Sequence, residues 1–108
     1  MGKKWVVQDL HGNTIYLTHE RWQHITENHP EMEDYPDHLK ETIKRGRRQQ
    51  EPLDPRKYRY IKYFEDLVKD NNHIAAIAMF KLEVDEKGNT VENNFILTAY
   101  QKYMKQKR

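Results

Sequence analysis

Two histidines, two hydroxyl side chains and one arginine are the residues of this chain best suited to acid–base chemistry. His24 and His29 lie five residues apart in the first third of the sequence, and Thr98 and Tyr100 alternate near its end. An imidazole exchanges a proton near neutral pH, and a positioned hydroxyl donates a hydrogen bond. Arg59 adds a permanent positive charge that can offset the charge of a phosphoryl group. Together these residue types indicate proton transfer at a phosphate.

Each of these side chains also has an ordinary structural explanation. His29 follows Ile25 on one helical stripe and can simply pack there, and His24 can lie on the surface of the same helix. Arg59 can pair with a residue on a neighbouring strand, and Tyr100 can be a half-buried strand residue. The chemistry therefore requires that the fold gathers these groups around one solvent-open hollow.

Metal and cofactor chemistry find no support in the spacing of the polar residues. His19, His24 and His29 recur every five residues, which turns each side chain about 140° around a helix from the last, so one ion cannot bind all three. The chain has no cysteine, and its glycines, at positions 2, 12, 46 and 88, do not cluster as a phosphate-binding loop requires. We expect neither a metal site nor a cofactor.

Length and composition indicate one small domain. The chain has 108 residues, of which 36% are hydrophobic and 11% aromatic, which suits one compact core. The longest apolar run, 74–80, is far shorter than the roughly 20 residues of a membrane span, and the N-terminus lacks the apolar stretch of a signal peptide. With the absence of cysteine, this favours a cytoplasmic protein without membrane contact. We expect a single domain over residues 1–108, with 101–108 as a flexible basic tail.

Charge is segregated along the chain, although the net charge is only +2. An acidic stretch covers residues 27–41, and a basic cluster follows it at Lys44, Arg45, Arg47 and Arg48. This cluster has two interpretations of equal weight. It is either the solvated end of a helix, where cations complement the macrodipole, or a patch that binds an anionic ligand.

An α+β fold is expected to position these residues. Hydrophobic periodicity, caps and turn residues divide the chain into a hairpin, two helices and three further strands. The predicted elements are a hairpin over 3–9 and 14–17, helices over 19–28 and 36–45, a loop over 51–56, strands over 58–64, 73–84 and 91–103, and a turn over 85–89. Both helices should pack on one face of a twisted antiparallel sheet.

The ends of the two helices carry recognisable signals. Thr18 is a typical N-cap, and Leu17 before it can pack on Trp22 to fix the entry angle of the first helix. Pro36 suits the first turn of the second helix, and Gly46 can close that helix in the left-handed conformation.

The two long strands determine which side chains share a face. The strand over 73–84 is apolar on both faces and is expected in the middle of the sheet. A helix is the alternative for this segment, but the β-rich segment 91–103 and the turn between them favour a hairpin. On the last strand Phe95, Leu97 and Ala99 should face the helices, which leaves the more polar opposite face to Asn94, Ile96, Thr98 and Tyr100.

The order of several short motifs resembles the phage-associated branch of the barnase, EndoU, colicin and RelE-like nuclease superfamily. The motifs are Leu17-Thr18-x-Glu20-x-Trp22-x-His24-Ile25, His29-Pro30-Glu31, an amphipathic helix, a proline-bearing loop, a Tyr-Arg-Tyr strand and a terminal Leu97-Thr98-Ala99-Tyr100. The resemblance spans most of the chain. It implies a small α+β domain that cleaves RNA without a metal ion, as a toxin or an effector in phage conflict.

The resemblance also implies a role for each matching residue. His24 or His29 would take the proton of a ribose 2′-hydroxyl, and Arg59 would offset charge on the phosphoryl oxygens. Tyr100 would act as the acid or orient the substrate, and Thr98 would donate a hydrogen bond. RNA, transfer RNA for example, would be the substrate and an immunity or antitoxin protein the cognate partner. The residues expected to contact RNA are Arg47, Arg48, Tyr58, Tyr60 and Lys62.

Two other functions remain open at this point. The segregated charges also suit a non-catalytic protein-binding or regulatory module on the same scaffold, in which the acidic stretch and the basic ends dock a partner. Exposed strand edges would in turn allow a homodimeric structural protein.

Overall fold

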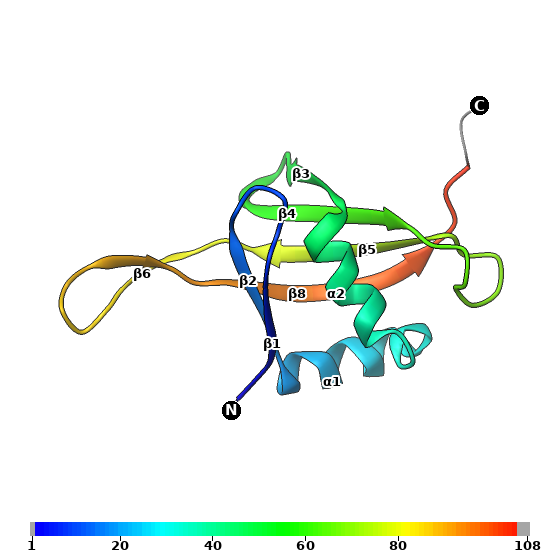
Figure 1. The fold of residues 1–108 in the computed structure, drawn as a ribbon, viewed down its shortest axis with the longest axis horizontal. Coiled ribbons are helices and arrows are strands. Elements are labelled where there is room, and N and C mark those ends of the chain that lie inside the picture. The colour runs from blue at the N-terminus through cyan, green and yellow to red at the C-terminus, as the bar shows by residue number, and fades with distance from the viewer. Residues whose placement is uncertain (1, 106–108) are drawn as a thin grey trace.

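Within residues 2–105, which the computed structural model describes, the chain forms a six-stranded sheet with two α-helices, a short 3₁₀ helix and a separate hairpin (Figure 1). The elements are β1 (Lys3–Gln8), β2 (Thr14–Thr18), α1 (His19–Asn28), η1 (Pro30–Met32), α2 (Pro36–Arg45), β3 (Arg47–Glu51), β4 (Asp54–Tyr63), β5 (His73–Met79), β6 (Leu82–Val84), β7 (Thr90–Glu92) and β8 (Asn94–Lys102). The sheet order is β1-β2-β8-β5-β4-β3. The α+β class is confirmed, but the sheet is mixed because β2 and β8 run parallel.

Helix α1 begins as its sequence predicts. The Thr18 side chain accepts a hydrogen bond of 3.0 Å from the Arg21 backbone N–H, which satisfies one of the free donors of the first turn. Leu17 is fully buried, and Trp22 packs against the same core. Neither α1 nor α2, the two α-helices of the described residues, is long and apolar enough to cross a membrane.

Gly46 ends α2 for a different reason from the one expected. Its φ of −72° is extended rather than left-handed, so the prediction of a left-handed cap is wrong. A Cβ atom at this position would clash with the Thr42 carbonyl oxygen and lie 2.9 Å from that of Ile61. Glycine is therefore required by the close approach of α2 to β4.

The core lies between the helices and one face of the sheet. Helix α2 packs across β4 and β5, while α1 and η1 pack beside β8. The buried cluster includes Ile25, Met32, Leu39, Ile43, Tyr60, Ile74, Ala76, Ala78, Ile96 and Ala99. The small alanines of β5 let neighbouring side chains and α2 approach closely, as expected for the middle strand of a sheet.

The expected loop over 51–56 is wrong. Its first residue, Glu51, ends β3, a strand that the sequence did not predict, and β4 begins at Asp54, so only a two-residue turn separates them. Pro55 is tolerated because it stands near the start of β4, where the β3–β4 register shifts and a missing ladder donor costs little.

The expected strand over 73–84 is interrupted after Met79. The following residues form the β6–β7 arm, a two-stranded hairpin that projects from the sheet (Figure 1). Asn94 explains the break, because its side chain accepts a hydrogen bond from the Lys81 backbone N–H and donates to the Thr14 carbonyl oxygen, 3.3 and 3.2 Å away. The predicted hairpin and its turn, with Gly88 at a φ of +84°, are confirmed.

A β-bulge at Leu97 changes which residues of β8 face the core. Ile77 pairs with Thr98 and Ala78 with Ile96, so Leu97 is the extra residue. Before the bulge Ile96 and Asn94 are buried, which contradicts their expected outward direction, and Phe95 faces outward instead of inward. After the bulge, Ala99 is buried as expected, and Thr98 and Tyr100 lie on the opposite face.

The flexible tail that was expected over 101–108 does not begin at residue 101. Gln101 and Lys102 belong to β8. The Gln101 side chain is buried, donates to the Glu31 carbonyl oxygen at 2.8 Å and accepts from the Val68 backbone N–H at 3.2 Å. Residues 106–108 of that prediction lie outside the described part of the chain.

A buried carboxylate joins the first hairpin to the opposite edge of the sheet. Asp9 follows β1 and accepts hydrogen bonds from the Tyr60 hydroxyl at 2.5 Å and from Arg48 Nη1 at 3.1 Å. Its other oxygen accepts from the backbone N–H groups of His11 and Asn13. Burial favours the neutral acid, but these bonds and the Arg48 charge outweigh it and hold the pKa of Asp9 below its ordinary value.

We expect the free energy of unfolding to fall as the pH drops below about 4, because a carboxyl whose pKa is lowered by folding contributes stability only while it is ionised. Chemical denaturation at a series of pH values measures this loss. Asp9→Ala should cost about 3 kcal/mol at neutral pH, since it leaves Arg48 buried without its partner. An unchanged pH profile in Asp9→Ala would show that another group causes the loss.

Candidate functional site

The sheet face turned away from α2 carries several of the candidate site residues, and we call it the open face. Cross-strand pairing fixes its composition, because paired residues point to the same side. One row across β3, β4, β5 and β8 is Gln49, Arg59, Ile77 and Thr98, and the next row is Arg47, Ile61, Ala75 and Tyr100. The fold therefore brings Arg59, Thr98 and Tyr100 onto one face.

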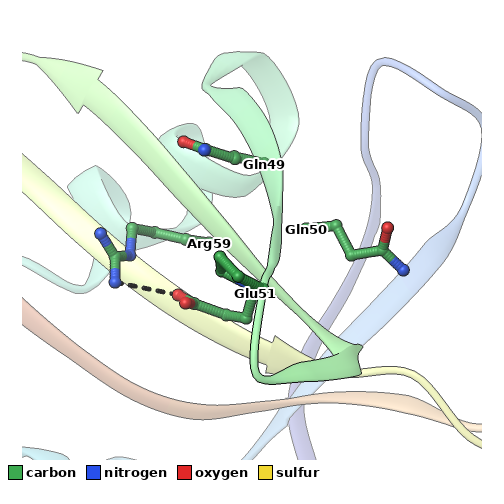
Figure 2. Close-up of a pocket in the computed structure, with 5 residues that line it drawn as sticks. Gln49, Gln50, Glu51 and Arg59 are labelled. Atoms are coloured by element: carbon green, nitrogen blue, oxygen red, sulfur yellow. Dashed lines mark ion pairs between the residues drawn. The ribbon is translucent and has the colours of Figure 1, made fainter.

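Arg59 lies on the open face in β4, the strand next to the β3 edge of the sheet. It lines three neighbouring hollows of about 260, 260 and 340 Å³, and the largest of them is also lined by Tyr100. Its Nη2 lies 2.9 Å from Glu51 Oε1, while its Nε is buried with no hydrogen-bond partner within the described residues. Figure 2 shows Arg59 and Glu51 turned toward each other on the side of Gln49, with Gln50 on the other side.

His29 meets Tyr100 where α1 ends beside β8. The centroids of the two rings are 5.6 Å apart. The Nδ1 atom of His29 lies 3.5 Å from Glu31 Oε2, and that carboxylate accepts from the Gln101 backbone N–H. The His29 side chain is 36% exposed. With Nδ1 turned to the carboxylate, Nε2 is the nitrogen available to a substrate.

A second histidine of the open face follows in the next row. His73 pairs with Lys102 on β8 and with Tyr63 on β4, and its Nδ1 lies 2.7 Å from Asn72 Oδ1. Burial is the main cause that lowers the pKa of His73, and the charges of Lys102 and Arg47 lower it further.

His24 is separated from this group. It is exposed on α1, and none of the side-chain hydrogen bonds, ion pairs or ring contacts between described residues joins its ring to His29 or Tyr100. His29 follows the last residue of α1 and leaves the helical conformation, with a φ of −132° and a ψ of 74°, whereas His24 stays within the helix. Of the two, the structure brings His29 to the open face.

The residues expected to contact RNA divide between the two faces of the sheet. Arg47 is exposed on the open face. Tyr60, expected to be exposed, is fully buried, so that prediction is wrong. Tyr58 and Lys62 share its face, where Tyr58 packs on Phe80 with a centroid distance of 4.6 Å. Residues of β4 separated by two positions share a side, and these three alternate with Arg59.

Arg48 also points inward. Its guanidinium bonds to Asp9 and Asn13 and lies over the Tyr58 ring at 4.4 Å, and its side chain is 16% exposed. Its role is structural. Arg45 of the same basic cluster pairs with Glu41 along α2 at 2.8 Å, which is the solvated helix end that one interpretation expected. Arg47 is the member of the cluster that is exposed on the open face.

Glu31, Glu51 and His73 also lie at the candidate site, although no role was predicted for them from the sequence, where Glu31 appears within the motif His29-Pro30-Glu31. Glu31 follows His29-Pro30, and a proline that starts a new turn is a usable signal that the next side chain folds back. Glu51 had no such signal, because its position depends on the irregular β3–β4 register. His73 was treated only as the start of a strand.

The open face combines positive charge, polar hydroxyls and aromatic rings. Such a surface can bind a phosphate through arginine and stack a base on a ring. Among the described residues, no three histidine, cysteine or acidic side chains are grouped so that they could hold a metal ion. Comparisons with models of protein families, with curated proteins and with solved structures found no match for this chain.

We expect Arg47→Gln and Lys102→Gln each to raise the pKa of His73, because each removes a positive charge that opposes protonation. An NMR titration of the imidazole Cε1 proton measures the change. Arg45→Gln is the matched control, since this arginine pairs with Glu41 on α2. Equal His73 pKa values in all four proteins would contradict the described arrangement of the open face.

Proposed function

We propose that the protein is a metal-independent ribonuclease-like domain that cleaves RNA on the open face. The main observation is that His29, Tyr100 and Arg59, which are far apart in the sequence, form one continuous group: His29 contacts Tyr100, and Tyr100 shares a hollow with Arg59. The group contains a proton acceptor, a proton donor and a fixed positive charge, the three components that phosphodiester cleavage by an internal hydroxyl requires.

In this reaction His29 Nε2 takes the proton of the ribose 2′-hydroxyl. The 2′-oxygen attacks the adjacent phosphorus, the bond from phosphorus to the 5′-oxygen breaks, and an acid gives that oxygen a proton. The Tyr100 hydroxyl is the candidate acid or orienting group. Arg59 offsets the charge that develops on the phosphoryl oxygens. Glu31 orients the imidazole, since its carboxylate lies beside Nδ1.

The rest of the open face suits a single-stranded polyanion. Arg47 and Lys57 flank Arg59 along the strands, and Tyr16 and Phe95 form an aromatic pair, with a ring-centroid distance of 6.0 Å, further along the face. A basic surface with interleaved rings is typical of proteins that stack the bases of unpaired RNA. The sequence resemblance to the phage-associated nucleases supports the same proposal.

The test is cleavage of total transfer RNA or of a defined single-stranded RNA in EDTA. We expect His29→Ala to lower the rate by about 100-fold or more, the range lost with a general base. His24→Ala is the matched control on the same helix and should stay close to the original rate. Equal loss in both variants, or no cleavage by the folded protein, would contradict the proposal.

Tyr100→Phe separates the chemistry of the hydroxyl from the packing of the ring. It keeps the contact with His29 but removes the proton donor. We expect kcat to fall while the affinity for a non-cleavable RNA changes little. A fall in affinity with unchanged kcat would assign Tyr100 to binding only.

The alternative function, a protein-binding module, is favoured by the β6–β7 arm. Leu82 and Val84 are 73% and 72% exposed, and the arm from 81 to 92 carries four acidic residues against two lysines. Exposed apolar residues on a projecting hairpin are typical of a docking surface. Under this alternative, a pull-down partner is lost when Leu82 and Val84 are both changed to Ser and is retained by His29→Ala, whereas the ribonuclease hypothesis expects no such dependence.

A further inference from the structure

The Arg59 guanidinium on the open face already has an anionic partner. Arg59 Nη2 lies 2.9 Å from Glu51 Oε1, and the two side chains are 37% and 22% exposed. The printed contact is made by Nη2, while Nε is buried without a hydrogen-bond partner among the described residues. The ion pair (Figure 2) therefore engages the guanidinium of Arg59 but leaves its Nε without a hydrogen bond.

Glu51 is held at this position by the backbone. It is the last residue of β3, pairs with Asp54 across the two-residue turn, and lines two of the hollows that Arg59 also lines. The neighbouring acid is engaged elsewhere, because Asp54 contacts Arg56 through both of its oxygens, at 3.1 and 3.2 Å. Of these two acids in the turn, Glu51 is the one that is paired with Arg59.

The geometry points to Glu51 as an internal competitor that a phosphate group of the ligand must displace from Arg59. The proposal rests on the proposed function only in taking the ligand to be a phosphodiester chain. A partly exposed ion pair contributes little stability, so displacement is cheap. A phosphate presents several oxygens to the guanidinium and can form a strong two-point contact with it, whereas the pair with Glu51 leaves Nε without a hydrogen bond.

Glu51 competes with every anion that binds Arg59, whether the anion is isolated or part of a polynucleotide. An isolated anion replaces Glu51 as the partner of Arg59 and makes no further contact. A polynucleotide gains that exchange and also the contacts of its neighbouring nucleotides with Arg47 and Tyr100 on the same face. Glu51 thus lowers the affinity for both kinds of ligand by the same factor, and the extended chain of phosphates compensates for that loss through its additional contacts.

The test is equilibrium binding of a 2′-O-methyl oligonucleotide, which carries phosphodiesters but no attacking hydroxyl, measured by calorimetry at fixed salt. We expect Glu51→Gln to tighten binding by about two- to five-fold, the fold-change that corresponds to a partly exposed ion pair. Asp54→Asn is the matched control, because it removes the same charge from the same turn without releasing Arg59. It should change the affinity much less.

Three further proteins, Glu51→Asp, Arg59→Gln and the double variant of Arg59→Gln with Glu51→Gln, make the result decisive. Glu51→Asp keeps the charge but shortens the side chain, so it should also tighten binding, and it decides the question if Glu51→Gln fails to fold. In an Arg59→Gln background, Glu51→Gln should bring no gain. The proposal is overturned if Asp54→Asn and Glu51→Gln have equal effects, if the gain persists without Arg59, or if Glu51→Gln binds no more tightly than the original protein. Because the probe cannot be cleaved, a tightened Glu51→Gln supports the proposal even if no ribonuclease activity is found.

Discussion

The buried carboxylate of Asp9 is the constraint on which the rest of this fold depends. It lies next to β1, at one edge of the sheet order, and its hydrogen-bond donors, Arg48 and Tyr60, come from the two strands at the other edge. A buried charge is tolerated only when it is paired and hydrogen-bonded. Its bonds to Arg48 and Tyr60 require the two ends of the sheet to approach each other on the side of the core. These two polar side chains of the inner face therefore have a structural role.

The bulge at Leu97 determines which side chains of β8 face the core and which face the open side. Strict alternation along β8 would continue the inward direction of Asn94 and Ile96 to Thr98 and Tyr100. One extra residue reverses the phase, so that the apolar Ile96 and the small Ala99 both enter the core while the hydroxyls face outward. Bulges often re-aim side chains next to functional sites. Because of the bulge, Tyr100 contacts the His29 ring and lines the same hollow as Arg59.

The two faces of β4 have different surroundings, because one packs in the core and the other belongs to the open face. Tyr60 and its neighbours at even positions build the core and its polar network, and Arg59 between them faces the open side. The aromatic and basic residues that make this strand resemble a nucleic-acid surface are therefore mostly structural. The electrostatic character of the open face comes instead from residues on several strands, among them Arg59 and its ion-pair partner Glu51.

Local signals in the sequence determined most of the elements. Periodicity and turn chemistry act over a few residues. They predict the first hairpin, the cap at Thr18, both helices, the middle strand and the turn that contains Gly88. The sequence also singled out His29, Arg59, Thr98 and Tyr100, although not their arrangement. The tertiary structure alone decided the strand β3, the bulge at Leu97, the burial of Tyr60 and the partners Glu31 and Glu51. Each of these depends on contacts between segments whose register is set by packing, and a single-residue change in register moves a side chain to the other face of a sheet without altering any local pattern.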